Sequence, residues 1–174
     1  MIRAALLATL AAEPVAAQHG GHEAPYGGLE GREIAALSPS DIDALRAGEG
    51  WGLALPAELN GHPGPVHLLE NADALGLDEG QRAAIRASWE AMNADARALG
   101  AALIEAEAAL DAAFEAGGLD ASRLDALVAE AADARGRLRA RHLAAHLEVA
   151  PLLTRHQIAT YDRLRGYGDG HGGH

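Results

Sequence analysis

The sequence contains no cysteine. This absence excludes disulfide bonds, thiolate metal ligands and a cysteine nucleophile. Aromatic residues are scarce as well, with two Trp, three Tyr and one Phe among 174 residues. The core must therefore be built from Leu, Ile, Val and Ala, and the abundance of Ala favours closely packed helices.

Positive charge is also in short supply. The chain has 14 Lys and Arg residues against 25 Asp and Glu residues, and its net charge is −11. This acidity suits cations and argues against nucleic acid or an anionic membrane as partner, because phosphate groups bind to basic surfaces. The sequence has no G-x-S-x-G motif, no phosphate-binding loop and no Gly-rich dinucleotide motif. We therefore expect no enzyme activity and no organic cofactor.

Long hydrophobic runs are missing after the N-terminus, so we expect no transmembrane segment in the mature chain. The first 17 residues have the features of a secretory signal peptide. Arg3 supplies a positive charge, residues 4–12 are mostly apolar, and Val15 to Ala17 form a small-residue cleavage site. We predict that residues 1–17 are removed and that the mature protein is periplasmic.

The mature chain divides into three parts by composition. Residues 18–37 are rich in Gly and His and are expected to be flexible, residues 38–166 form a helical domain, and residues 167–174 form a second Gly- and His-rich tail that is expected to be disordered. A short helix is expected to follow the cap residue Ser38 and to stop at Gly48.

Between this short helix and the long runs lies a turn-rich stretch, residues 50–65, from which Leu53, Leu55 and Leu59 could pack onto a larger element. A further short helix is predicted over residues 66–75, ended by Gly76.

Two long runs with apolar residues at spacings of four and three predict an antiparallel helical hairpin. The first run extends from Asp78 to about Ala116, and the second follows the turn at residues 117–118 and is restarted by Pro151 before a final short helix ends near Gly166. The predicted seam residues are Ile85, Trp89, Met92, Ala96, Leu99, Leu103, Ala106, Leu110 and Phe114 in the first run, and Leu124, Val128, Ala131, Arg135, Leu138, His142, Ala145, Val149 and Leu152 in the second.

Other apolar residues of the hairpin lie beside the seam and need a further partner. These residues are Leu127, Leu143, Leu147 and Leu153. The short helices could cover part of them and a second copy of the chain the rest. We therefore expect an all-α hairpin that forms a homodimer.

The same pattern occurs at two predicted helix starts. Leu77-Asp78-x-x-Gln81 and Leu153-Thr154-x-x-Gln157 each place a capping side chain before the helix, and the Gln can bond back to nearby backbone. Two such caps around a helical hairpin resemble the LTxxQ-motif family of periplasmic proteins, which includes the Spy and CpxP stress proteins, the zinc-associated ZraP and the CnrX-type metal sensors.

The resemblance covers residues 64–167. The first motif departs from the family pattern by having Asp78 in place of Thr, which preserves capping. The resemblance implies an all-α hairpin without catalytic chemistry, usually dimerised into a curved four-helix-type assembly. It also implies one of three activities, because family members bind unfolded proteins without ATP, adjust envelope-stress signalling, or bind Zn, Ni, Co or Cu.

His142 and His146 are the main candidates for metal binding. Their i,i+4 spacing on a helix puts both imidazoles on one face, within reach of a single ion. His142 also lies on the predicted seam, where Arg135 occupies an equivalent position. Metal ligation, a structural network of His with a carboxylate, and exposed histidines without a role therefore stay open as interpretations.

Further ligands would have to come from other segments. Counting back across the turn places Glu90, Asn93 and Asp95 near the level of the His pair. His67 and Glu70 form a neighbouring i,i+3 pair if their helix folds back onto the hairpin. Two or three imidazoles with a carboxylate suit Zn, Ni, Co or Cu(II). The metal sensors of the resembled family use a similar helical pair with an outlying Glu.

The remaining histidines are weaker candidates. His19, His22, His171 and His174 lie in the two Gly-rich tails, where they could chelate Zn or Cu with modest affinity or serve only to solubilise the chain. His62 and His156 are isolated in loop and cap positions, and no role is expected for either residue.

Two functions follow from these observations. The first is a periplasmic metal-binding protein that senses or buffers heavy metals or serves the envelope-stress response, with a membrane-bound sensor as a candidate partner. The alternative is an ATP-independent chaperone of the Spy/CpxP type that binds unfolded clients on exposed apolar patches. A helical adaptor that only binds a protein partner forms a third class.

Overall fold

The computed structural model describes residues 25–167. The chain divides into two units, residues 1–30 and residues 31–174. Of the first unit, residues 25–30 are described, and they form a turn in which the Leu29 N–H donates to the Tyr26 carbonyl. The tail histidines His19, His22, His171 and His174 lie outside the described residues.

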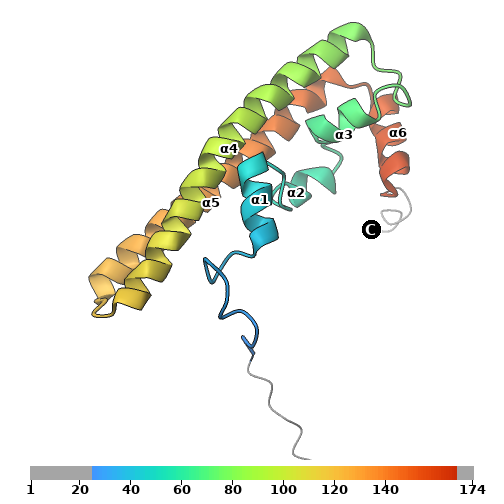
Figure 1. Ribbon diagram of the computed structural model, residues 1–174. Helices are drawn as coiled ribbons and strands as arrows, with labels where there is room; N and C mark the ends of the chain where they lie inside the picture. The colour runs from blue at the N-terminus through green and yellow to red at the C-terminus, as the bar shows by residue number, and fades with distance from the viewer. Residues whose placement is uncertain (1–24, 168–174) are drawn as a thin grey trace, which may run out of the picture. The chain divides into compact units, whose positions relative to one another are not determined.

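All the described helices belong to the second unit (Figure 1). They are α1 (Pro39–Ala47), α2 (Leu55–Glu58), α3 (Pro65–Glu70), α4 (Glu79–Ala116), α5 (Ala121–Val149), the 3₁₀ helix η1 (Ala150–Leu152) and α6 (Arg155–Arg165). Helices α4 and α5 run side by side as a long antiparallel hairpin, which confirms the predicted all-α hairpin fold (Figure 1).

The seam between α4 and α5 follows the predicted spacing, with a shift of one residue at two places in α5. Leu127 and Ala134 are buried, whereas Val128 is 48% exposed and Arg135 places its guanidinium 4.7 Å from the centre of the Trp51 ring. Turning Leu127 inward buries more apolar surface than turning Val128 inward, and it leaves the charge of the arginine in water. The predicted seam positions Val128 and Arg135 were therefore wrong.

The seam also ends earlier than predicted. Phe114, the last predicted seam residue of α4, is 61% exposed. It precedes the turn at Gly117 and Gly118, both of which have positive φ. The buried residues nearest to the turn are Ala106 on α4 and Leu127 on α5.

Helix α1 packs closely against the middle of α4. A side chain at Gly100 would place its Cβ 2.4 Å from the Leu45 carbonyl oxygen, so only glycine permits this approach. At the other end of α1, Ser38 and Asp41 form a capping box, and the Asp41 carboxylate also accepts from the Trp51 indole N–H at 2.8 Å. The hydrogen bonds from Ser38 and then Trp51 lower the pKa of Asp41 to about 2.

The segments before the hairpin differ from their predicted forms in three ways. Ile34 and Leu37, from a stretch expected to be flexible, are buried in the same core as α1. The turn-rich residues 50–65 contain the short helix α2, and of its neighbouring leucines only Leu53 is buried, while Leu55 and Leu59 are exposed. Helix α3 stops at Glu70, and turns continue to Gly76 in place of the predicted helix.

The two motif positions form capping boxes and also contact each other. Asp78 and Thr154 each accept from the backbone N–H of the Gln three residues later, and each Gln accepts from the backbone N–H of its cap residue. The two amide side chains, of Gln81 and Gln157, then form reciprocal hydrogen bonds of 3.0 Å. The start of α6 is thereby fixed to the start of α4.

Within residues 25–167, no helix combines the length and the apolar character that crossing a membrane would require.

Candidate functional site

A cavity of about 700 Å³ lies among the helices of the second unit. Its wall includes residues from each of the six α-helices and from the loop between α1 and α2. The side chains on this wall that carry nitrogen or oxygen are those of Glu49, Trp51, Glu58, His67, Glu70, Trp89, Asn93, His142, His146, Arg165 and Tyr167. Four of the six predicted core ligands, namely His67, Glu70, His142 and His146, thus share one cavity.

His142 contributes a buried ring nitrogen that has no hydrogen-bond partner. The residue is 4% exposed, and its Nε2 atom is the one buried side-chain nitrogen or oxygen without a partner among the described residues. Burial, and then the nearby His146 and Arg141, lower the pKa of His142. The ring is therefore neutral at pH 7, which is the form in which imidazole binds metal ions.

His146 is oriented by the backbone. Its Nδ1 atom lies 2.7 Å from the carbonyl oxygen of His62, and because a carbonyl can only accept, Nδ1 carries the hydrogen. In the neutral ring, Nε2 then keeps its lone pair. Gly64 packs against this ring, since a Cβ there would lie 2.9 Å from the His146 Cε1 atom. A histidine held in this way by its other nitrogen is typical of metal ligands.

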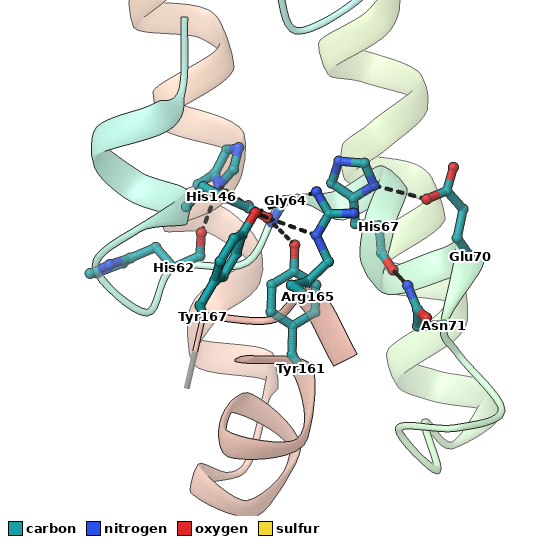
Figure 2. Close-up of polar contacts among 10 residues, drawn as sticks. His62, Gly64, His67, Glu70, Asn71, His146, Tyr161, Arg165 and Tyr167 are labelled. Carbon is teal, nitrogen blue, oxygen red and sulfur yellow. Dashed lines mark hydrogen bonds and ion pairs between the residues drawn. The ribbon is translucent and has the colours of Figure 1, made fainter. Parts of the chain in front are cut away.

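His67 is held in the same way by a carboxylate. Its Nδ1 atom lies 2.8 Å from the Glu70 Oε2 atom, one helical turn further along α3. Figure 2 shows the rings of His67 and His146 across from each other, each with one nitrogen on a dashed line. The second nitrogen of each ring is left for another partner.

Glu58 of α2 is a site residue that the sequence did not single out. The residue is 8% exposed. The Oε2 atom of its carboxylate accepts from the Gly64 N–H at 3.2 Å and lies 3.8 Å from the His146 Nδ1 atom. It was missed because residues 50–65 have no helical periodicity to mark a buried face. The Gly-His-Pro-Gly-Pro run after it indicates only a turn.

The other carboxylate oxygen of Glu58 faces α6. Oε1 accepts a short hydrogen bond from the Tyr161 hydroxyl and a second, of 3.2 Å, from the Tyr167 hydroxyl. The Arg165 Nε atom lies 3.5 Å from the same oxygen. Burial and the bond to Glu58 raise the pKa of Tyr161, so this phenol stays protonated and donates.

Two predicted ligands do not reach the cavity. Glu90 is exposed, and Asp95 accepts from the Arg141 guanidinium at 2.8 Å; neither residue lines the cavity. Both therefore differ from the prediction, because the helix turns their side chains away from the wall that His142 forms. Met92, which was predicted only as a seam residue, lines the cavity instead and could offer a thioether.

The histidines are brought together without forming a compact ligand cluster. Among residues 25–167, no group of three or more His, Asp or Glu side chains is arranged to hold an ion. A metal ion would need rotation of these side chains or ligands from solvent. The unpartnered Nε2 atom of His142 and the oriented rings of His67 and His146 nevertheless fit the donor set that a borderline divalent ion prefers.

Comparison with known proteins gives one match, to a family of sequences. The sequence model of a family described as heavy-metal resistance matches residues 52–159, more than half of the chain, and the matched region contains the hairpin and both capping motifs. No curated protein and no solved structure gives a significant match. The chain therefore belongs to the heavy-metal resistance family, as its resemblance to the LTxxQ-motif proteins predicted.

Proposed function

We propose that this protein binds a divalent transition-metal ion (Zn, Cu, Ni or Co) in the cavity and that it senses or buffers heavy metals in the periplasm without enzymatic activity. The observation that carries the proposal is the buried Nε2 atom of His142, which has no partner although burying a polar atom costs free energy. A bound ion would satisfy this atom. Membership of a heavy-metal resistance family supports the same conclusion.

Three imidazoles are the proposed ligands. His142 and His146 come from one face of α5 and His67 from α3, and each lines the cavity. Glu70 and the His62 carbonyl hold the Nδ1 atoms of His67 and His146, so Nε2 is the ligating atom of both rings. Because ligating imidazoles must be neutral, the affinity for the ion is expected to fall in acid.

The test is equilibrium dialysis of the chain against Zn²⁺, Cu²⁺, Ni²⁺ and Co²⁺ in separate experiments. His19, His22, His171 and His174 are replaced by Asn in every sample, so that only the core histidines differ between variants. Replacing either His142 or His146 by Gln is expected to lower affinity about 10- to 100-fold for the preferred ion. His156→Gln is the matched control, because this imidazole is exposed on α6 and does not line the cavity.

The proposal fails if the protein with intact core histidines binds no more metal than the variant with both His142→Gln and His146→Gln. Circular dichroism of each variant shows whether a loss of binding comes with a loss of helix. A variant that keeps its helix and loses the ion identifies a ligand.

Sensing, as opposed to buffering, requires a partner that responds to the bound form. We propose a homodimer that engages a membrane-bound sensor, because exposed apolar residues on α5 and α6, such as Leu147 at 60% and Leu164 at 48%, leave surface for further contacts. Sedimentation equilibrium tests the dimer; a monomer at micromolar concentration, with and without metal, contradicts it.

An ATP-independent chaperone is the second candidate function. The observation in its favour is the number of large apolar side chains on the surface, which include Leu55, Leu59, Phe114, Val128, Leu147, Leu152 and Leu164. The net charge of −11 would repel acidic clients. Aggregation of a heat-denatured client is measured with and without Zn²⁺; no suppression at an equimolar ratio in either condition would eliminate this function.

A further inference from the structure

Glu58 joins the histidine cavity to the C-terminal helix. One carboxylate oxygen accepts from the Gly64 N–H and lies beside His146. The other accepts hydrogen bonds from the hydroxyls of Tyr161 and Tyr167 and forms an ion pair with Arg165, all on α6 or just after it. Figure 2 shows the side chains of Tyr161, Arg165 and Tyr167 pointing toward one another on the side where His146 lies. A single buried carboxylate thus contacts both the candidate metal ligand His146 and the end of α6.

The two ends of α6 are held by different means. Its start is held by the capping box of Thr154 and by the amide pair between Gln81 and Gln157. Its far end is held at Glu58, through an ion pair with Arg165 and a hydrogen bond from the Tyr167 hydroxyl. The Arg165 guanidinium carbon also lies 5.8 Å from the centre of the Tyr167 ring. The position of the far end therefore depends on whether the Glu58 carboxylate stays in contact with Arg165 and Tyr167.

A dication in the cavity changes this balance of charge. It would attract the Glu58 carboxylate and repel the guanidinium of Arg165, which lines the same cavity. Both forces weaken the contact between Glu58 and the end of α6, and neither acts on the Gln81–Gln157 pair at its start.

We propose that Glu58 couples the histidine site to α6, so that metal binding draws Glu58 toward the ion and releases the end of α6 around Arg165 and Tyr167. This inference rests on the proposed function, since it needs an ion at His142 and His146. It adds a conformational change, the release of the end of α6, to metal binding at the site. The released segment is the part of the described chain that a metal-dependent partner would recognise.

Coupling of this kind is reciprocal. If the ion weakens the contact between Glu58 and Arg165, then removing that contact must strengthen binding of the ion. Arg165→Gln is therefore expected to raise Zn²⁺ affinity about 5-fold or more, the lower range of measured coupling between sites. A merely structural role for Arg165 predicts the opposite, because loosening the cavity wall would weaken binding.

Arg163→Gln is the matched control for this measurement. Arg163 lies on the same helix and carries the same charge, but it donates to the Thr160 hydroxyl and does not line the cavity. Its replacement is expected to leave Zn²⁺ affinity within about 2-fold. A rise for Arg163→Gln equal to that for Arg165→Gln would show a general effect of net charge and would overturn the proposal.

Hydrogen exchange gives a second, independent readout. In the full chain with Asn at the four tail histidines, saturating Zn²⁺ is expected to speed amide exchange at residues 163–167 at least 5-fold and to leave residues 155–158 unchanged. In Glu58→Gln, the carboxylate charge is lost, and the exchange rates of residues 163–167 are expected to be the same with and without Zn²⁺.

The outcomes separate this inference from the proposed function. If Zn²⁺ does not bind through His142 and His146, both fail. If it binds but exchange at residues 163–167 is unchanged or slower, the coupling is wrong and the metal site stands. Unchanged or weaker binding by Arg165→Gln, with its helix content intact by circular dichroism, has the same consequence.

Discussion

The contact of α1 with α4 and the cluster around Glu58 lie in the same unit, yet they are built in opposite ways. At the first, Leu45 and Leu103 are each 1% exposed, Ala96 is fully buried, and the backbone of α1 approaches Gly100 without any side chain between them. At the second, the buried groups are the carboxylate of Glu58, the phenol of Tyr161 and the imidazole of His146.

This difference distinguishes residues that stabilise the fold from polar residues that could bind a ligand. Apolar contacts stabilise in proportion to the area they bury and need no particular partner. Buried charged and polar groups contribute little net stability even when paired, and an unpaired one lowers it. The unpartnered nitrogen of His142, on the wall of the cavity that Glu58 also lines, is therefore not explained by a contribution to stability.

The largest effect is expected from Gly100→Ala. The added Cβ would lie 2.4 Å from the Leu45 carbonyl oxygen, so α1 must move away from α4. We expect a loss of about 3 kcal/mol in the free energy of unfolding, measured by urea denaturation. Gly136→Ala on α5 is the control: nothing lies within 4 Å of its Cβ position, and it should be neutral or more stable by up to about 1 kcal/mol. Equal effects of the two substitutions would contradict the close contact.

A smaller loss in the free energy of unfolding is expected from Tyr161→Phe. Tyr161 is fully buried, and its hydroxyl donates to the carboxylate of Glu58, a residue that is 8% exposed. Removing the donor leaves one carboxylate oxygen with fewer partners and should cost about 2 kcal/mol of unfolding free energy. Thermal and urea denaturation both measure this change. A loss below about 0.5 kcal/mol would mean that solvent reaches Glu58 and replaces the phenol.

Acid should destabilise the protein through His142. Its pKa is lowered in the folded state from the ordinary value of 6.5, so the unfolded chain takes up the proton first. The stability that comes from keeping this ring neutral is present above pH 6.5 and is lost as the pH falls below it, by at most about 1.4 kcal/mol per pH unit. Urea denaturation between pH 7.5 and 5 measures the loss. His142→Leu should remove this part of the pH dependence; an identical profile in the variant would assign the effect to other groups.

The smallest effect is expected to have the opposite sign. At pH 7.5 and without metal, His142→Leu removes a buried nitrogen that has no partner and should raise the unfolding free energy by about 1 kcal/mol. The same variant should lose metal affinity. A destabilisation of more than about 1 kcal/mol would show that His142 has a structural partner and belongs with the contacts that hold the fold.

Much of the fold could be predicted because its determinants are local. The spacing of apolar residues predicted the two long helices. Asp78 and Thr154 predicted where α4 and α6 begin, since these side chains bond to backbone three residues away. The one-residue shift at Leu127 could not be predicted, because Val128 fits the same spacing and only the packing against α4 distinguishes them.

The site was predicted in part. His142 and His146 share a helix face by their spacing alone, and His67 with Glu70 forms the expected pair on α3. Whether Glu90 and Asp95 belong to the same site depended on how α4 is rotated, and that rotation turns them outward, toward Arg141 in the case of Asp95. No periodic pattern marks residues 50–65, so the part that Glu58 plays could not be seen.

The amino-acid sequence by itself determined the helical hairpin, its two capping motifs and the family, because each depends on residues close together in the chain. The tertiary structure alone decided which polar groups share the cavity. It places Glu58 of α2 between His146 of α5 and Arg165 of α6, residues that are 88 and 107 positions away along the chain (146 − 58 and 165 − 58). Contacts over such separations are made by the packing of whole helices, which no local pattern encodes.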